Sequence, residues 1–225
     1  MRKLFKLAVI CLASLFAFPH LARAGVGTSG GGHAVVCDVT RADKLGFVTL
    51  LDLYEAQHVF HLELRARLGD LKLELNTLAE QLHIVIGASE RIPSPLNGET
   101  LFEWWENRVQ FIPGMSASTG DYGVMPVIPR GCSIQQIAIY DDTKDIIRVN
   151  QDLWESLDDF NKAALIAHEL IYHDRRLSDR EFSSETSRYL VGRIFSTHVL
   201  ADSETLVQEF RTSHNGALNQ RKRGP

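Results

Sequence analysis

The sequence has few cysteines, no excess of basic residues and no long apolar run beyond its first 24 residues. Of three cysteines, only Cys37 and Cys132 lie after position 24. No later stretch approaches the roughly 20 apolar residues that a membrane-spanning helix needs, so we expect no transmembrane segment there. The chain has 24 Lys and Arg against 28 Asp and Glu. This balance argues against a protein that binds nucleic acid or anionic membranes.

The first 24 residues have the three parts of a secretory signal peptide. Basic residues precede an apolar run over 7–18, and Ala22-Arg23-Ala24 forms a small-x-small cleavage site. Cleavage there removes four basic and no acidic residues, so the net charge changes from −4 to −8. We therefore predict an exported protein, periplasmic or extracellular. A single globular domain is expected over 25–212, and the tail at 213–225 lacks apolar anchors and is expected to be disordered.

Export makes a disulfide between Cys37 and Cys132 the natural prediction, because an even pair of cysteines oxidises in such a compartment. A metal site built on the two cysteines is the alternative, but neither has a close Cys or His partner at a ligand-type spacing. His33 follows a glycine run, and we expect it to be solvated at the end of a flexible leader, Gly25–Gly32.

The periodicity of the apolar residues predicts an α+β fold that is mainly helical and has a small antiparallel sheet. Ser133–Tyr140 and Asp145–Val149 alternate as two strands around a turn, which predicts a hairpin over 133–149. Ala34–Cys37 reads as a strand that a disulfide would hold beside Cys132. We expect this sheet to pack on a helix at 158–173.

A regular leucine series predicts further helix over about 64–85. Its members alternate in steps of four and three: Leu64, Leu68, Leu71, Leu75, Leu78, Leu82 and Val85. A helix packed on the core and a dimer formed through residues 64–85 both fit this series. A helical pattern already begins near Val48, and on it Glu55, His58 and His61 stand at i, i+3 spacing. These three side chains either bind a metal on one helix face or form solvated surface.

Shorter patterns complete the expected elements. Leu101–Val109 and Glu181–Leu200 read as helices, and Ser203–Arg211 as a last helix. Residues 111–131 are rich in Gly and Pro and are expected to be irregular.

The residues with the most chemistry gather on the predicted helix at 158–173, in the run His168-Glu169-Leu-Ile-Tyr-His173. Asp158 or Asp159 can accept hydrogen bonds from its first turn. Zinc proteases place two His four residues apart, with a Glu beside them as general base. Here the spacing is five. At roughly 100° per residue, four residues separate side chains by about 40° and five by about 140°. A π-bulge would bring the two rings together.

Two hypotheses follow from this helix. In a zinc hydrolase, His168 and His173 are metal ligands and Glu169 is the catalytic base, with a third ligand among Asp174, Asp179, Glu181 and Glu185. In a structural or binding protein of the cell envelope, which needs no cofactor, the same residues form a buried polar cluster. There Glu169 pairs with Arg188, Tyr172 lies beside them, and His168 bonds locally.

The order of a hairpin strand, a short turn and an HE-bearing helix resembles the core of zincin metallopeptidases. The resemblance covers Ile134–His173. It implies a peptidase, or an inactive descendant now used for binding, with substrate held along the strand that precedes the helix. The stretches GGGHAVVC, LDLYEA and AALIAHELIY through SRYLVGRIFS are also similar to small secreted bacterial proteins of no known activity. That resemblance implies export and a shared fold, without implying a chemistry.

Overall fold

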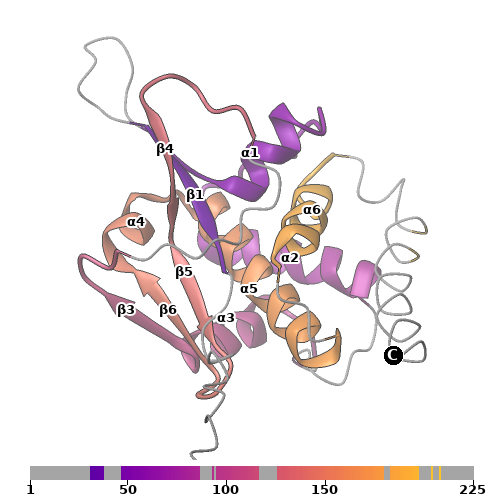
Figure 1. Cartoon of the computed structure of the whole chain (residues 1–225). Coiled ribbons are helices and arrows are strands. Elements are labelled where there is room, and N and C mark those ends of the chain that lie inside the picture. The colour runs from indigo at the N-terminus through magenta and orange to yellow at the C-terminus, as the bar shows by residue number, and fades with distance from the viewer. Residues whose placement is uncertain are drawn as a thin grey trace, which may run out of the picture.

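Two small sheets lie on one side of a group of helices (Figure 1). The structure is a computed structural model and describes residues 31–37, 47–86, 93, 95–116, 126–179 and 183–197, with 204 and 208. These residues form six α-helices and two three-stranded sheets, which confirms the predicted α+β class. None of the helices in these ranges is long and apolar enough to cross a membrane. The predicted signal peptide, the tail and all but two residues of the predicted helix at 203–211 lie outside them.

The first sheet is antiparallel and has the order β2-β1-β4. Its strands are β1 (His33–Cys37), β2 (Val48–Leu50) and β4 (Cys132–Gln136). Cys37 lies directly opposite Cys132, and the two form the predicted disulfide. The bridge joins positions 95 residues apart, and closing so long a loop in the unfolded chain corresponds to about 4–5 kcal/mol in the chain-entropy model.

The second sheet has the order β3-β6-β5, with β3 (Val109–Ile112), β5 (Ala138–Asp141) and β6 (Ile146–Asn150). The predicted hairpin exists as β5 and β6, but its first strand is not continuous. The chain passes from β4 of the first sheet to β5 of the second at Ile137. There the N–H groups of Ile137 and Ala138 both donate to the Gly32 carbonyl, at 2.9 and 3.1 Å. The sheet also gains β3, which runs parallel to β6, so the prediction of irregular structure from residue 111 is wrong at its start.

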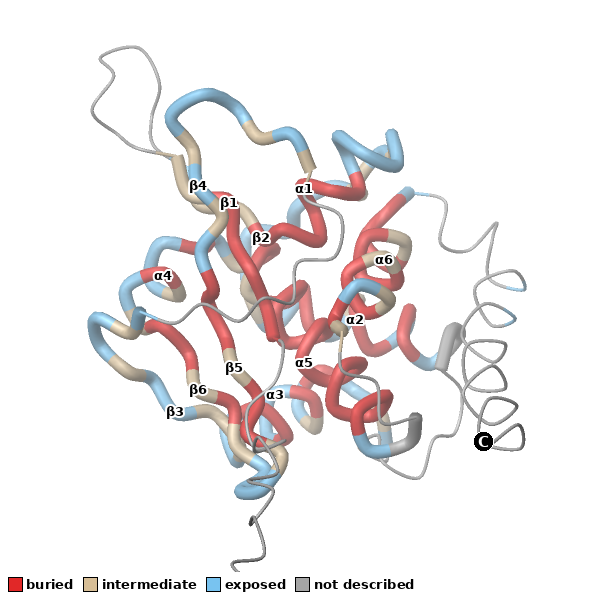
Figure 2. The backbone as a smooth tube through the Cα atoms, in the orientation of Figure 1, coloured by how far each residue is buried: buried red, intermediate tan, exposed pale blue. Residues whose placement is uncertain are grey.

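Helix α5 (Asp159–Asp179) runs through the interior and is buried along most of its length (Figure 2). It begins as predicted, because the Asp158 carboxylate accepts a hydrogen bond from the Asn161 N–H at 2.8 Å. The prediction that it ends at His173 is wrong. The polar residues that follow find buried partners: Arg176 is 5% exposed and pairs with Asp142 at 2.8 Å. Tertiary contacts therefore keep residues 174–179 helical, although their polar sequence predicts a connection between helices.

The N-terminal helices are α1 (Leu51–His58) and α2 (Leu71–Ile86). The helical prediction is wrong from Val48 to Leu50, which form β2, and from 59 to 70. Leu64 makes an isolated antiparallel bridge to Ser196, and Leu68 is 45% exposed. The second half of the leucine series packs as expected, since its members are buried: Leu75, Leu78 and Leu82. Whether the chain also dimerises through 64–85 stays a prediction.

The remaining helices are α3 (Gly98–Glu106), α4 (Gln151–Ser156) and α6 (Glu185–Ile194). Helix α6 packs against α1 at Gly192, where an added Cβ would lie 2.9 Å from the Ala56 Cβ. Only glycine permits so close an approach at this crossing. One turn earlier on α6 lies Arg188, which this approach sets opposite Glu55.

Candidate functional site

Five charged or ionisable side chains of α1, α5 and α6 form a buried cluster. They are Asp52 and Glu55 of α1, His168 and Glu169 of α5, and Arg188 of α6, and none is more than 6% exposed. We call this set the buried cluster. Burying so many ionisable groups is costly unless they are paired and hydrogen-bonded, so each partner matters.

His168 is paired with Asp52. Its Nδ1 lies 2.6 Å from Asp52 Oδ1, and both side chains are fully buried. Burial by itself lowers the pKa of His168. The charge and hydrogen bond of Asp52, together with the charge of Glu169, outweigh burial and raise that pKa above its ordinary value. The pair therefore favours an imidazolium beside a carboxylate. Tyr172, also buried, lies on the same side of the helix, with ring centroids 6.2 Å apart.

Glu169 bonds to the backbone of the segment before β1. Its Oε1 accepts the Gly32 N–H at 2.8 Å, and no described residue hydrogen-bonds to its Oε2. Burial raises the pKa of Glu169 to about 7, although the His168 charge and the Gly32 N–H pull it down. Its acid and carboxylate forms are thus both populated near neutral pH. The predicted ion pair between Glu169 and Arg188 is wrong.

Arg188 is bound by α1. Its Nε donates to Glu55 Oε2 at 3.0 Å, and its Nη1 donates to Ser184 Oγ at 3.1 Å. The reason is the close packing of α6 on α1 at Gly192, which brings Glu55 within reach. Burial raises the pKa of Glu55 to about 6, against the lowering effect of the Arg188 charge.

His33 is a further histidine of this region and is fully buried, so the prediction that it is solvated is wrong. Gly31 and Gly32 are also buried, which corrects the flexible leader at its C-terminal end; residues 25–30 lie outside the described ranges. Gly31 has a φ of 153°, and an added Cβ would lie 2.2 Å from the Ala138 carbonyl oxygen. Burial, then repulsion from His168 and Arg188, lowers the pKa of His33 to about 4, so it is neutral.

His173 belongs to a different network, at the other side of α5. Its Nε2 lies 3.0 Å from Asp145 Oδ1, and the rings of Trp104 and Tyr140 pack edge-on against it at 5.6 and 5.4 Å. Burial lowers the pKa of His173, and the Asp145 charge offsets only part of this. The structure therefore does not bring His168 and His173 together.

The helix shows no π-bulge that would change this, since α5 is regular α-helix from residue 159 to 179. Among the described residues, no three His, Cys, Asp or Glu side chains are arranged to hold a metal ion. Of the predicted third ligands, Asp174 is buried on α5 and Glu185 is exposed on α6. Glu181 and the side chain of Asp179 lie outside the described part. The zinc-hydrolase hypothesis therefore requires a rearrangement of α5.

The second predicted metal set, Glu55, His58 and His61, does not lie on one helix face. Helix α1 ends at His58, and His61 has a φ of 53° in the turn that follows. The regular i, i+3 spacing is therefore interrupted after His58. Glu55 itself faces Arg188.

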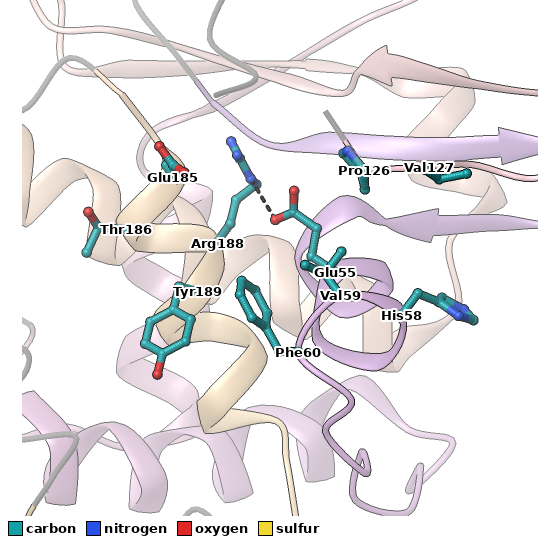
Figure 3. Close-up of a pocket in the computed structure, with 10 residues that line it drawn as sticks. All are labelled: Glu55, His58, Val59, Phe60, Pro126, Val127, Glu185, Thr186, Arg188 and Tyr189. Atoms are coloured by element: carbon teal, nitrogen blue, oxygen red, sulfur yellow. Dashed lines mark hydrogen bonds and ion pairs between the residues drawn. The ribbon is translucent and has the colours of Figure 1, made fainter. Parts of the chain in front are cut away.

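A surface hollow of about 680 Å³ opens beside the buried cluster, between α1 and α6. We call it the α1–α6 hollow. Figure 3 shows the Glu55–Arg188 ion pair in its wall, with His58 pointing away from the pair. Glu185 also lines it, so two carboxylates face one guanidinium. The other lining residues are mostly apolar or aromatic. Phe60 and Tyr189 pack edge to face, with centroids 5.2 Å apart.

The sequence reading missed Asp52, although a signal was present. Asp52 and Glu55 interrupt an otherwise apolar run, Leu50–Ala56, at a spacing that places both on one helix face. Charged residues within such a run indicate buried, partnered groups. Gly32 offered no signal, because its role is a backbone N–H bonded to a residue 137 positions away.

Comparisons of the chain with protein-family models, with curated proteins and with solved structures found no match. The chemistry of the α1–α6 hollow and of the buried cluster is therefore the basis for inferring a function.

Proposed function

We propose that this is an exported binding protein whose α1–α6 hollow takes a ligand with an apolar body and a cationic group. The observation that carries the proposal is the pairing in the hollow's wall. Arg188, its only described cation, is bonded to Glu55, while Glu185 adds a second carboxylate. The disulfide supports export, because such bonds persist in oxidising compartments.

The electrostatics of the hollow favour a cation. The formal charge of its lining is negative by one, and the whole chain carries −4. A positive group between Glu55 and Glu185 gains from both carboxylates, while an anion meets a guanidinium that is already paired. The rings of Phe60 and Tyr189 add apolar surface, and aromatic rings attract cations to their faces.

The buried cluster contributes rigidity. Arg188 is held between Glu55 and Ser184, and α1 and α5 are linked by the Asp52–His168 pair. Groups fixed in this way lose little freedom when a ligand binds, which favours affinity. The other members of the cluster thus position Glu55, which faces the ligand.

Calorimetric titration with three probes of similar size tests the proposal: 2-phenylethylammonium, 2-phenylethanol and phenylacetate. We expect the cation to bind most tightly and the anion most weakly. Glu185→Gln should weaken binding of the cation by about three- to fivefold, the effect of a partly solvated charge. Glu106→Gln, an exposed carboxylate of α3 outside the hollow, is the matched control and should have no effect.

The pH dependence sharpens the same test. Because the pKa of Glu55 is about 6, its carboxylate form is lost as the pH falls from 7.5 to 5. Cation affinity should fall over this range, while affinity for the neutral alcohol should stay level. Tightest binding of phenylacetate, or no binding of any of the three probes, would overturn the proposal.

A further inference from the structure

A second hollow of about 730 Å³ adjoins the first across the last turn of α1. Its lining includes Phe47, Tyr54, Asp152 and Asp158, and we call it the α1–α4 hollow. His58 lines both hollows, so the two are separated by one helical turn. We infer that the ligand is a linear basic peptide that crosses this turn and occupies both hollows. This inference rests on the proposed function and names its ligand class.

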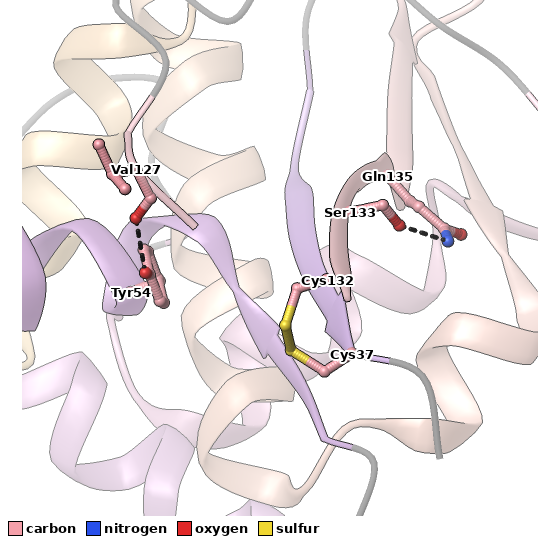
Figure 4. Close-up of a disulfide and its surroundings, with 6 residues drawn as sticks. All are labelled: Cys37, Tyr54, Val127, Cys132, Ser133 and Gln135. Carbon is pink, nitrogen blue, oxygen red and sulfur yellow. Dashed lines mark hydrogen bonds between the residues drawn. A yellow bond between two sulfur atoms is a disulfide. The ribbon is translucent and has the colours of Figure 1, made fainter. Parts of the chain in front are cut away.

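The boundary between the hollows is well fixed. The rings of Tyr54 and His58 lie 4.4 Å apart between centroids, and the Tyr54 hydroxyl donates to the Val127 carbonyl at 2.8 Å. Figure 4 shows this bond together with the Cys37–Cys132 bridge, whose two cysteines pack against the same small apolar cluster as Tyr54. Cys37 itself lines the α1–α4 hollow, so the disulfide anchors one wall of it.

The chemistry of the second hollow repeats that of the first. Its charged lining residues are Asp152, Asp158 and Arg67, and Arg67 is already paired with Asp158. One carboxylate is again in excess, and an exposed aromatic ring, Phe47, lies in the lining. Two adjacent sites that each combine a carboxylate in excess with aromatic surface suit a ligand that repeats a cation and an apolar group.

A peptide has the dimensions that this arrangement requires. An α-helix with its side chains is about 10 Å across, and an extended chain advances about 3.3 Å per residue. About three residues therefore cross the turn at His58, with a Lys or Arg and an apolar residue on each side. Lys and aromatic side chains in one extended segment provide both groups, and the exposed polar side chain of Gln57 in the second hollow can bond to a peptide amide.

The test compares a bivalent peptide with a short ligand. The heptapeptide acetyl-Lys-Phe-Gly-Gly-Gly-Lys-Phe-amide should bind at least about tenfold more tightly than 2-phenylethylammonium, because the second contact is intramolecular. Asp152→Asn should weaken the heptapeptide about threefold and leave binding of the short cation to the α1–α6 hollow unchanged. Asn keeps an oxygen that can accept the Gly114 N–H now bonded to Asp152 at 3.1 Å. Glu185→Gln should weaken the binding of both ligands, and Glu106→Gln should weaken the binding of neither.

The outcomes separate the two proposals. Tight binding of 2-phenylethylammonium with no gain for the heptapeptide, and no effect of Asp152→Asn, overturns the peptide inference and leaves the proposed function standing. Failure of both ligands to bind overturns the proposed function. The hexasaccharide of N-acetylglucosamine serves as the competing probe. If it binds while the heptapeptide does not, the occupant is a glycan and the inference is wrong.

Discussion

The two histidines of α5 lie five residues apart and occupy opposite environments. His168 meets Asp52, which is fully buried, and His173 meets Asp145, whose side chain is 48% exposed. With the buried partner the attraction is little screened, and it raises the pKa of His168 despite complete burial. With the exposed partner, burial prevails and the pKa of His173 is lowered. The two sites differ in the burial of the carboxylate and in the neighbouring charge, because Glu169 adds to the attraction at His168 whereas Arg108, paired with Asp145 at 3.1 Å, opposes it at His173.

Removing the carboxylate charge of each pair should have the largest effect on stability. At pH 6, Asp52→Asn should lower the free energy of unfolding by about 3–5 kcal/mol, because a buried imidazolium loses its counter-charge. Asp145→Asn should cost about 1 kcal/mol or less, since that carboxylate is half exposed. Asn also tolerates the positive φ of 54° at this position. Denaturant unfolding measures both values.

Equal losses of stability in Asp52→Asn and Asp145→Asn would contradict the difference between the two pairs. Asp159→Asn, which removes a partly exposed i, i+3 pair with Lys162, serves as a control for the change of residue type. It should fall within about 1 kcal/mol of the native chain.

The next effect concerns Glu169, the residue beside His168. Its pKa is about 7 in the folded chain against 4.5 unfolded, so the folded state holds a proton that the unfolded state has lost. Stability contributed by this group is complete below pH 4.5 and is lost as the pH rises toward 7. Relative to Glu169→Gln, the native chain should lose up to about 3 kcal/mol over this range. Unfolding curves at pH 4.5, 6 and 7.5 measure the difference, and parallel pH profiles for the two proteins would contradict it.

A smaller effect is expected from the crossing of α1 and α6. Gly192→Ala places a methyl group against Ala56 and should cost about 1–3 kcal/mol by overpacking. It should also weaken binding of 2-phenylethylammonium, because Arg188 and Glu55 move apart. The environment of His173 should not change. Unaltered stability and binding would show that the close approach at Gly192 does not position the pair.

Features with local or compositional causes could be predicted from the sequence. Asp158 caps α5 because its carboxylate reaches its own helix, and Cys37 and Cys132 pair because no other cysteine follows the first 24 residues. The five-residue spacing also predicted correctly that His168 and His173 diverge on a regular helix.

Features that depend on distant partners could not be predicted. Asp52 and His168 are 116 residues apart, and Glu55 and Arg188 are 133 apart. Arg188 bonds to Glu55 of α1, which packs closely on α6 at Gly192, whereas Glu169 bonds to Gly32. The sequence predicted a solvated His33 because it follows a glycine run. Gly31 and Gly32 instead allow the chain to approach β5 and α5 closely. The continuation of α5 past His173 likewise depends on Arg176 reaching Asp142.

His168 and His173 belong to separate sites. An NMR titration of their ring signals, assigned with His168→Gln and His173→Gln, tests this separation directly when repeated with one equivalent of zinc. We predict that the pKa of His168 lies above 6.5 and that of His173 below it, and that zinc does not shift both rings. A joint shift of both rings at one zinc per chain would contradict the account, because it would show that α5 rearranges to bring them to one ion.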